Sequence, residues 1–226
     1  MLFSSIPFLY YFLPVVLILY FAVPSKLKNL VLLLSSLFFY GWGEPRYVII
    51  MGIAIVAGYV FGRLIEAFRG KGLSKVFFIL SLLSSVAMLG YFKYVDFFIT
   101  NLNAVTGLSI PLLKIALPIG ISFYTFQLLS YLVDVYRGTV PAQKNIINFG
   151  AYIAMFPQLI AGPIVKYKTV AEELNHRVNT TEQFVLGARR FCVGLAKKVL
   201  LANSIGALWE THIPLWFSFC NLNAYP

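Results

Sequence analysis

Long apolar runs separated by short polar connections dominate the pattern of the 226-residue chain. A helix needs about 20 apolar residues to cross a bilayer. The pattern therefore predicts spanning helices at about 7–23, 29–42, 47–64, 76–95 and 115–135. The second run is short for a span, but the lysines at its start can lengthen it by placing their charged ends at the interface. We expect an all-α integral membrane protein.

Features within the third and fourth predicted spans suggest how they pack. Gly52, Gly58 and Gly62 in the third span would let a neighbouring helix approach closely. Aromatic residues gather at the exit of the fourth span, as in the aromatic belt of a membrane interface. We expect a loop over 96–114, because this stretch contains asparagines, a glycine and a proline.

The stretch 115–138, which contains the fifth predicted span, carries unusual polar residues. Tyr124, Gln127, Tyr131 and Asp134 recur at steps of three and four, so a helix gathers them on one side. Polar groups at membrane depth are costly unless they face protein or water. We therefore predict that this side of the helix lines an interior path. Polar contact between helices is the alternative, and it stays open. The candidate path-lining residues are Tyr124, Gln127, Ser130, Tyr131, Asp134 and Arg137.

Composition supports the membrane assignment and limits the partners. Charged residues make up 12% of the chain and hydrophobic ones 60%, whereas soluble domains are nearer a quarter charged. The net charge is +10, but the basic residues cluster between apolar runs, which sets topology and does not indicate nucleic-acid binding. The connections at 24–28 and 63–75 are basic and should be cytoplasmic, which places the N-terminus outside.

The pattern changes after residue 138. The apolar segment 146–161 is short, contains Pro157 and has basic flanks on both sides, so we expect it to be re-entrant. Residues 182–201 form an amphipathic pattern that favours a helix in the inner membrane interface, and a spanning helix with a buried polar side is the alternative. Residues 211–226 match neither pattern and form an atypical tail after a region at 1–210.

Classical catalytic and metal-binding residues are scarce. Cys192 and Cys220 lack metal-ligand spacing, so we predict no metal site and no catalytic cysteine. His176 lies in a polar loop, and His212 precedes an Ile-Pro pair. No defensible pair of nucleophile and base is present, and Ser122 and Ser130 are better explained as hydrogen-bonding residues of a helix.

Two blocks of sequence resemble the membrane-bound O-acyltransferase family. The first is LPIGISFYTFQ at 117–127, followed by SYLVDVYRG at 130–138. The second is FPQLIAGPI at 156–164, with a re-entrant motif of Pro157, Gln158, Gly162 and Pro163. The resemblance covers 1 to about 210 and is nearest to the alginate O-acetyltransferase-like branch.

The resemblance implies a fold, a reaction and partners. The fold would be part of a ring of spanning helices with re-entrant and in-plane helices at the cytoplasmic side. The reaction would transfer an acyl group, in this branch acetyl, from an acyl-thioester donor or its carrier to hydroxyls of an exported polysaccharide. The implied partners also include membrane lipid and other cell-surface acetylation proteins. The implied location is the bacterial cytoplasmic membrane, with no bound cofactor.

The chain departs from the family at its key histidine. The family places that residue in a Trp-His-Gly context downstream of both blocks, and neither His176 nor His212 matches it. No catalytic residue is therefore assigned, and we expect an N-terminal fragment that is inactive alone. The alternatives are a transporter or channel subunit, favoured by the same polar side, and a structural membrane subunit.

Overall fold

The computed structural model describes residues 4–159, 165–175, 177 and 180–209. All regular secondary structure in these ranges is helical. The chain divides into two compact units, one of which is Val15–Arg177 and the other Leu2–Pro14 with Val178–Pro226. Three helices in the described ranges are long and apolar enough to cross a membrane, at Pro45–Ala67, Gly72–Thr106 and Thr181–Trp209, and Pro7–Ala22 is a shorter apolar helix. This architecture is that of an all-α integral membrane protein.

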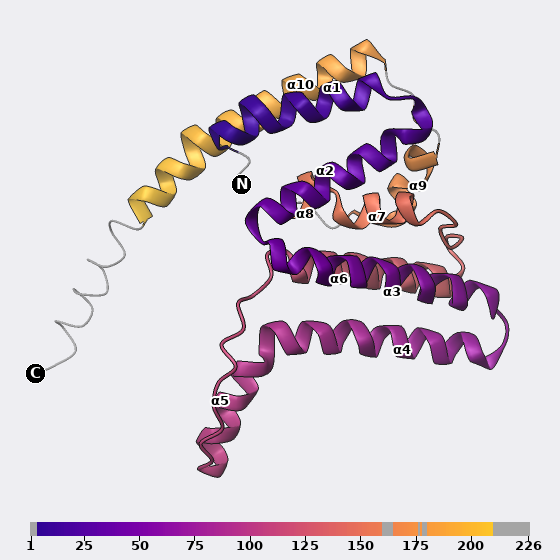
Figure 1. Ribbon diagram of the computed structural model, residues 1–226, viewed down its shortest axis with the longest axis vertical. Coiled ribbons are helices and arrows are strands. Elements are labelled where there is room, and N and C mark those ends of the chain that lie inside the picture. The colour runs from indigo at the N-terminus through magenta and orange to yellow at the C-terminus, as the bar shows by residue number, and fades with distance from the viewer. Residues whose placement is uncertain (1–3, 160–164, 176, 178–179, 210–226) are drawn as a thin grey trace, which may run out of the picture. The chain divides into compact units, whose positions relative to one another are not determined.

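The larger unit is a layered helical bundle. It contains α2 (Lys28–Gly43), α3 (Val48–Ala67), α4 (Gly72–Leu89), α6 (Ile121–Arg137) and α7 (Ile146–Ala154), and α1 (Leu13–Ala22) leads into it. Figure 1 shows the α3–α6 pair between α4 on one side and α2 with α7 on the other. The main apolar core therefore lies around α6.

Small residues allow α6 to lie directly against α3. A Cβ atom added at Gly58 would be 2.8 Å from Leu128 Cδ1, and one added at Gly62 would be 2.8 Å from Tyr131 Oη. The close approach that these two glycines predict is therefore present. Gly52 has no neighbouring atom within 4 Å and plays no part in it.

The prediction of a loop over 96–114 is wrong in its first half. After α4, a π-helical stretch at Gly90–Tyr94 leads into α5 (Val95–Thr106), and only residues 107–120 are mainly non-helical. Helix α5 ends where Gly107 adopts a left-handed conformation (φ 71°). The asparagines that suggested a loop instead bond through their side chains to backbone groups near or within the helix.

The predicted start of the fifth span at 115 is also wrong. Helix α6 begins at Ile121, because Pro118 favours extended backbone before it and Gly120 is left-handed (φ 75°). A side chain at Gly120 would put its Cβ 2.5 Å from the Leu159 carbonyl oxygen. This glycine therefore fixes both the start of α6 and its contact with the segment after α7.

The region after α6 contains short helices and one long one. Helix α7 has nine residues, about 14 Å, and is too short to span a bilayer. It is followed by α8 (Phe156–Leu159) and α9 (Tyr167–Asn175), so the residues before His176 are helical where we expected a polar loop. The reason is that Tyr167 and Leu174 are buried on one side of α9, which packs against α6 and α7.

The second unit contains α10 (Thr181–Ala196), whose first turn is capped by the Thr180 hydroxyl. The helical run continues to Trp209, and its described side chains are almost all exposed. Its length and composition suit a spanning helix as well as the expected interfacial one, so both interpretations stay predictions. The 211–226 tail, His176, His212, Gly162 and Pro163 lie outside the described residues.

Candidate functional site

Three of the six predicted path-lining residues are packed inside protein. Tyr124 and Tyr131 have no exposed surface, and Gln127 is 5% exposed. Their side of α6 packs against α3, α7 and α9. Within the described residues these side chains therefore meet other helices, as the alternative of helix-to-helix contact predicted.

Gln127 has a specific structural task. Helix α7 stops at Met155, so the carbonyls of its last turn lack continuing helical partners. The backbone N–H of Phe156, which in an unbroken helix would donate to the carbonyl of Tyr152, donates to Ser36 Oγ at 3.2 Å. The carbonyl oxygen of Tyr152 instead accepts from Gln127 Nε2 at 2.9 Å and from Gln158 Nε2 at 2.8 Å.

These two hydrogen bonds join the two sequence blocks. Gln127 belongs to the first block on α6, and Gln158 belongs to the second block on α8. A broken helix at membrane depth must have its free backbone groups paired by surrounding protein. Gln127, a polar residue that looked anomalous in an apolar span, thus pairs the backbone at the break between α7 and α8. The neighbouring Pro157 is exposed.

An aromatic and amide cluster continues from this break toward one end of the bundle. The ring of Tyr167 lies edge-on to those of Tyr131 and Tyr152, with centroids 5.0 and 5.2 Å away. The backbone N–H of Gln143 donates to Tyr131 Oη, and its side-chain Nε2 donates to Tyr167 Oη, both at 3.0 Å. Burial raises the pKa of Tyr167, and its bond with Gln143 opposes this shift. The cluster joins α6, α7, α9 and the 139–145 connection through hydrogen bonds and ring contacts.

Gln143 and Ser36 carry contacts that the sequence did not reveal. Gln143 was part of an apparently ordinary polar connection, and Ser36 lies in an apolar run. Buried Ser and Gln in apolar surroundings need partners, which is the one signal that singles them out. Three further hydroxyls, Tyr40 Oη, Tyr124 Oη and Thr125 Oγ1, are buried and have no hydrogen-bond partner in the described residues.

The remaining predicted path-lining residues lie along an edge of α6 that the described residues cover only in part, here called the uncovered edge. Ser130 and Asp134 are half-buried, and Arg137 is exposed one turn further on. No ion pair joins Asp134 to Arg137 in the described residues. The carbonyl of Asp134 accepts from both the backbone N–H and the hydroxyl of Thr139, which ends the helix. The side chains of Ser130, Asp134 and Arg137 on this edge are thus at least partly exposed.

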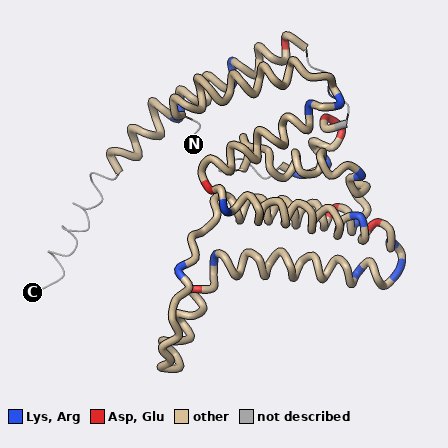
Figure 2. Tube along the Cα trace, in the orientation of Figure 1, with Lys and Arg blue, Asp and Glu red and all other residues tan. Residues whose placement is uncertain are grey.

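Charged residues concentrate at the end of the bundle where α3 turns into α4 (Figure 2), and the following contacts bring the end of α6 at Arg137 to the same place. Arg69 donates to the Val135 carbonyl at 2.8 Å, and Glu66 accepts from the Ala142 N–H at 3.0 Å. Arg63 and Glu66 form an ion pair at 3.4 Å. These contacts fix the end of α6 to the turn between α3 and α4.

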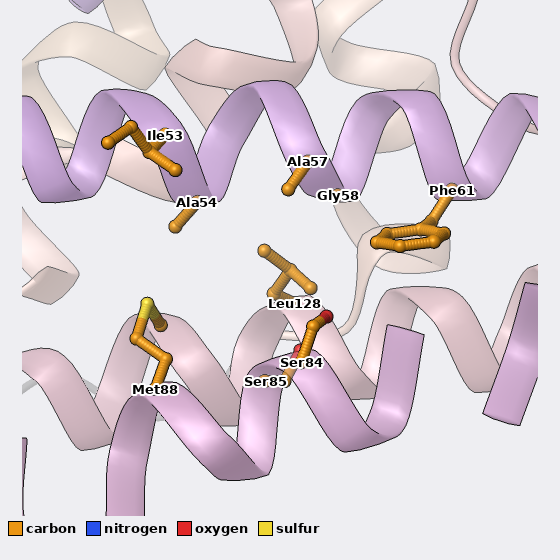
Figure 3. A pocket seen from close by; sticks show the side chains of 9 residues that line it. All are labelled: Ile53, Ala54, Ala57, Gly58, Phe61, Ser84, Ser85, Met88 and Leu128. Atoms are coloured by element: carbon orange, nitrogen blue, oxygen red, sulfur yellow. The ribbon is translucent and has the colours of Figure 1, made fainter. Parts of the chain in front are cut away.

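A separate cavity of about 210 Å³ lies between α3, α4 and α6 (Figure 3). Its lining is apolar apart from Ser84 and Ser85, and α6 contributes only Leu128. None of the predicted path-lining residues faces this cavity. No group of three or more potential metal ligands occurs within the described ranges.

The chain is similar in sequence to known O-acetylating proteins. It is 41% identical over 214 residues to a probable alginate O-acetylase of Pseudomonas aeruginosa and 39% identical over 213 residues to that of Azotobacter vinelandii. Each match covers 92% of this chain. Over most of its length the chain is therefore similar to proteins named as alginate O-acetylases. A peptidoglycan O-acetyltransferase of Helicobacter pylori is also similar, with 30% identity over 90% of the chain.

The matches cover only part of these relatives. The chain spans 41%, 43% and 45% of the length of the Pseudomonas, Azotobacter and Helicobacter proteins. No family model and no solved structure matches the chain. The resemblance found in the two sequence blocks is confirmed.

Proposed function

We propose that the chain forms part of a membrane O-acyltransferase that transfers an acetyl group from an acyl thioester to hydroxyls of an exported polysaccharide. The observation that carries this proposal is the 41% identity with an alginate O-acetylase over 92% of the chain. Because the named acceptors of the relatives include both alginate and peptidoglycan, the shared chemistry is esterification of a glycan hydroxyl.

The geometry supports a role for α6 as one wall of the transfer path. Its buried side is fixed to α7 and α8 through the Tyr152 carbonyl, and its uncovered edge carries Ser130, Asp134 and Arg137. Ionisable groups in membrane segments usually face protein or a water-filled space. The edge with Asp134 would therefore face the path, and the segment around the α7–α8 break would be re-entrant beside it.

In this proposal the described residues supply the frame of the site and no catalytic base. In acyl transfer, a base must take the proton of the attacking hydroxyl while hydrogen-bond donors stabilise the negative charge that develops on the carbonyl oxygen. The described residues contain no histidine. The base would come from a part of the enzyme that the matched segment does not include.

Charge also supports an orientation. The basic turn between α3 and α4 would face the cytoplasm, and the turn between α2 and α3 would face outward. In the bacterial cytoplasmic membrane this puts the end of α6 with Asp134 and Arg137 on the side of a cytoplasmic thioester donor. Other cell-surface acetylation proteins would meet the enzyme on the outer side.

A chimeric enzyme tests the proposal. This chain would replace the matching segment of the alginate O-acetylase in Pseudomonas aeruginosa, and acetyl esters in the secreted alginate would be measured. We expect the chimera to restore acetylation relative to cells lacking the enzyme. Alginate without acetyl esters, from cells whose membranes contain the chimera at the native level, would refute the assignment.

A further inference from the structure

The segment from α5 to residue 117 folds back on itself as a hairpin, here called the α5 hairpin (95–117). Its base is fixed by the Asp96 carboxylate, which accepts from the backbone N–H groups of Leu113 and Lys114 at 2.8 and 3.0 Å. Near its tip, Asn103 and Ile110 exchange two hydrogen bonds of 2.8 and 3.1 Å. The hairpin is thus a defined structural element and not a loose connection.

The hairpin has an apolar surface and no charge beyond its base. Residues 97–113 contain no Asp, Glu, Lys or Arg, and Figure 2 shows charges only where the hairpin meets α4. Val105 is 86% exposed, and Phe98 is 64% exposed. The other large exposed apolar side chains of this segment are Phe97, Leu102, Leu108, Ile110, Leu112 and Leu113.

Polar side chains on α5 bond to the helix itself. Thr100 Oγ1 donates to the Asp96 carbonyl at 2.7 Å, Asn101 Nδ2 to the Phe97 carbonyl at 2.7 Å, and Thr106 Oγ1 to the Leu102 carbonyl at 2.6 Å. Side chains in contact with water do not need such partners. In an apolar environment an unpaired polar group is costly, and bonding to the preceding turn removes that cost.

The apolar and polar residues of α5 lie on different sides of the helix. Phe97, Phe98, Leu102 and Val105 fall on one side at helical spacing, and Asp96 and Asn103 fall on the other. The returning segment bonds to the second side, which leaves the apolar side uncovered. Figure 1 shows α5 turning away from the direction of α4 at the π-helical stretch. If α4 crosses the membrane, α5 therefore runs along the plane of the membrane near its surface.

We propose that the α5 hairpin lies in the lipid bilayer at the end of the bundle where α2 and α3 meet, with the Phe97–Val105 side of α5 against acyl chains. Tyr47 Oη, at the start of α3, donates to the Ala116 carbonyl at 2.6 Å and holds the hairpin at that end. Lys93 Nζ lies over the ring of Tyr94, 5.3 Å from its centroid, as expected of a cation and an aromatic ring at a membrane interface.

A lipid bilayer accounts for all of these features together. The apolar side suits acyl chains, the internally bonded polar groups suit a medium without water, and the charged base suits the headgroup region. A docked soluble protein would not require the internal bonding of Thr100 and Thr106. The proposal does not depend on the acyl-transfer assignment, since it concerns only how this element meets the membrane.

Fluorescent probes at single cysteines test the proposal. Cys192 and Cys220 would be changed to serine in the full chain, and Val105→Cys, Phe98→Cys and Gly72→Cys would each carry an environment-sensitive probe in phosphatidylcholine nanodiscs. Gly72 is exposed at the first residue of α4, next to the basic turn between α3 and α4, and serves as the aqueous control. Quenching would be measured with iodide in the water and with nitroxide groups on the lipid acyl chains.

We expect the lipid nitroxides to quench probes at 98 and 105 several-fold more strongly than the probe at 72, and iodide to show the reverse order. Iodide quenching at 98 and 105 equal to that at 72 would overturn the proposal. Protection of both positions from both quenchers would also overturn it, because protein would then cover the surface. Two positions on the same side keep the test decisive if one variant fails to insert.

Discussion

Replacing the two glutamines that bond to the Tyr152 carbonyl should show strong coupling. Gln127→Leu and Gln158→Leu each remove one of two donors, so the buried carbonyl keeps one partner in either single variant. The double variant leaves that carbonyl without either amide. Stability should therefore fall more in the double variant than the two single losses added together.

The magnitudes follow from what each variant leaves unpaired. One lost hydrogen bond should cost about 0.5–1.5 kcal/mol, and pairs between membrane helices average about 0.6 kcal/mol. A buried carbonyl with no partner costs about 1–3 kcal/mol. We expect single losses of about 1 kcal/mol each and an additional coupling loss of about 1–2 kcal/mol in the double variant.

Reversible unfolding by dodecyl sulfate in mixed micelles, followed by circular dichroism, would give the four free energies of the cycle. Gln183→Leu is the matched control, because Gln183 is exposed on α10 and should change stability by no more than about 0.5 kcal/mol. Additive losses in the double variant would show that the two amides do not share one acceptor, and would refute the reasoning.

Three further predictions address packing, pH and topology. Gly62→Ala should destabilise by about 1–3 kcal/mol in the same unfolding assay, because its Cβ would lie 2.8 Å from a tyrosine hydroxyl, while Gly52→Ala, with open space, should not. Burial raises the pKa of Tyr167, because the folded protein disfavours the charged phenolate. The stability that the neutral Tyr167 side chain contributes is therefore present below about pH 10 and is lost as the pH rises further. Tyr167→Phe should flatten that part of the curve of melting temperature against pH. In intact cells, an impermeant thiol reagent should label Gly43→Cys and not Gly72→Cys, and the opposite pattern would reverse the proposed orientation.

Hydropathy predicted the helices well where apolar residues alone decide. The third span was expected at 47–64, and α3 runs from Val48 to Ala67. The errors in helix bounds came from residues whose type is common in more than one kind of structure. Asn103 suggested a loop, but it bonds to the segment that returns past it. Pro118 and Gly120 looked like part of an apolar run, but their backbone preferences delay the start of α6.

The candidate site was predicted in part. Spacing placed Gln127 and Tyr131 on one side of a helix, and both are buried on the same side of α6. Spacing could not tell which side would be covered by α7, because that depends on contacts between residues far apart in the chain. The partner of Gln127 is a backbone carbonyl 25 residues away, and no side-chain pattern indicates it.

The most direct test of the account asks whether the uncovered edge of α6 faces the transfer path. In the chimeric enzyme, Ser130→Cys and Asp134→Cys would be exposed to a small water-soluble thiol reagent with and without acetyl-coenzyme A, and Leu83→Cys, an exposed apolar position of α4, is the control. The account predicts that both α6 positions are modified, that the thioester slows their modification, and that position 83 does not react. Unreactive α6 positions in a folded, acetylating chimera would contradict it.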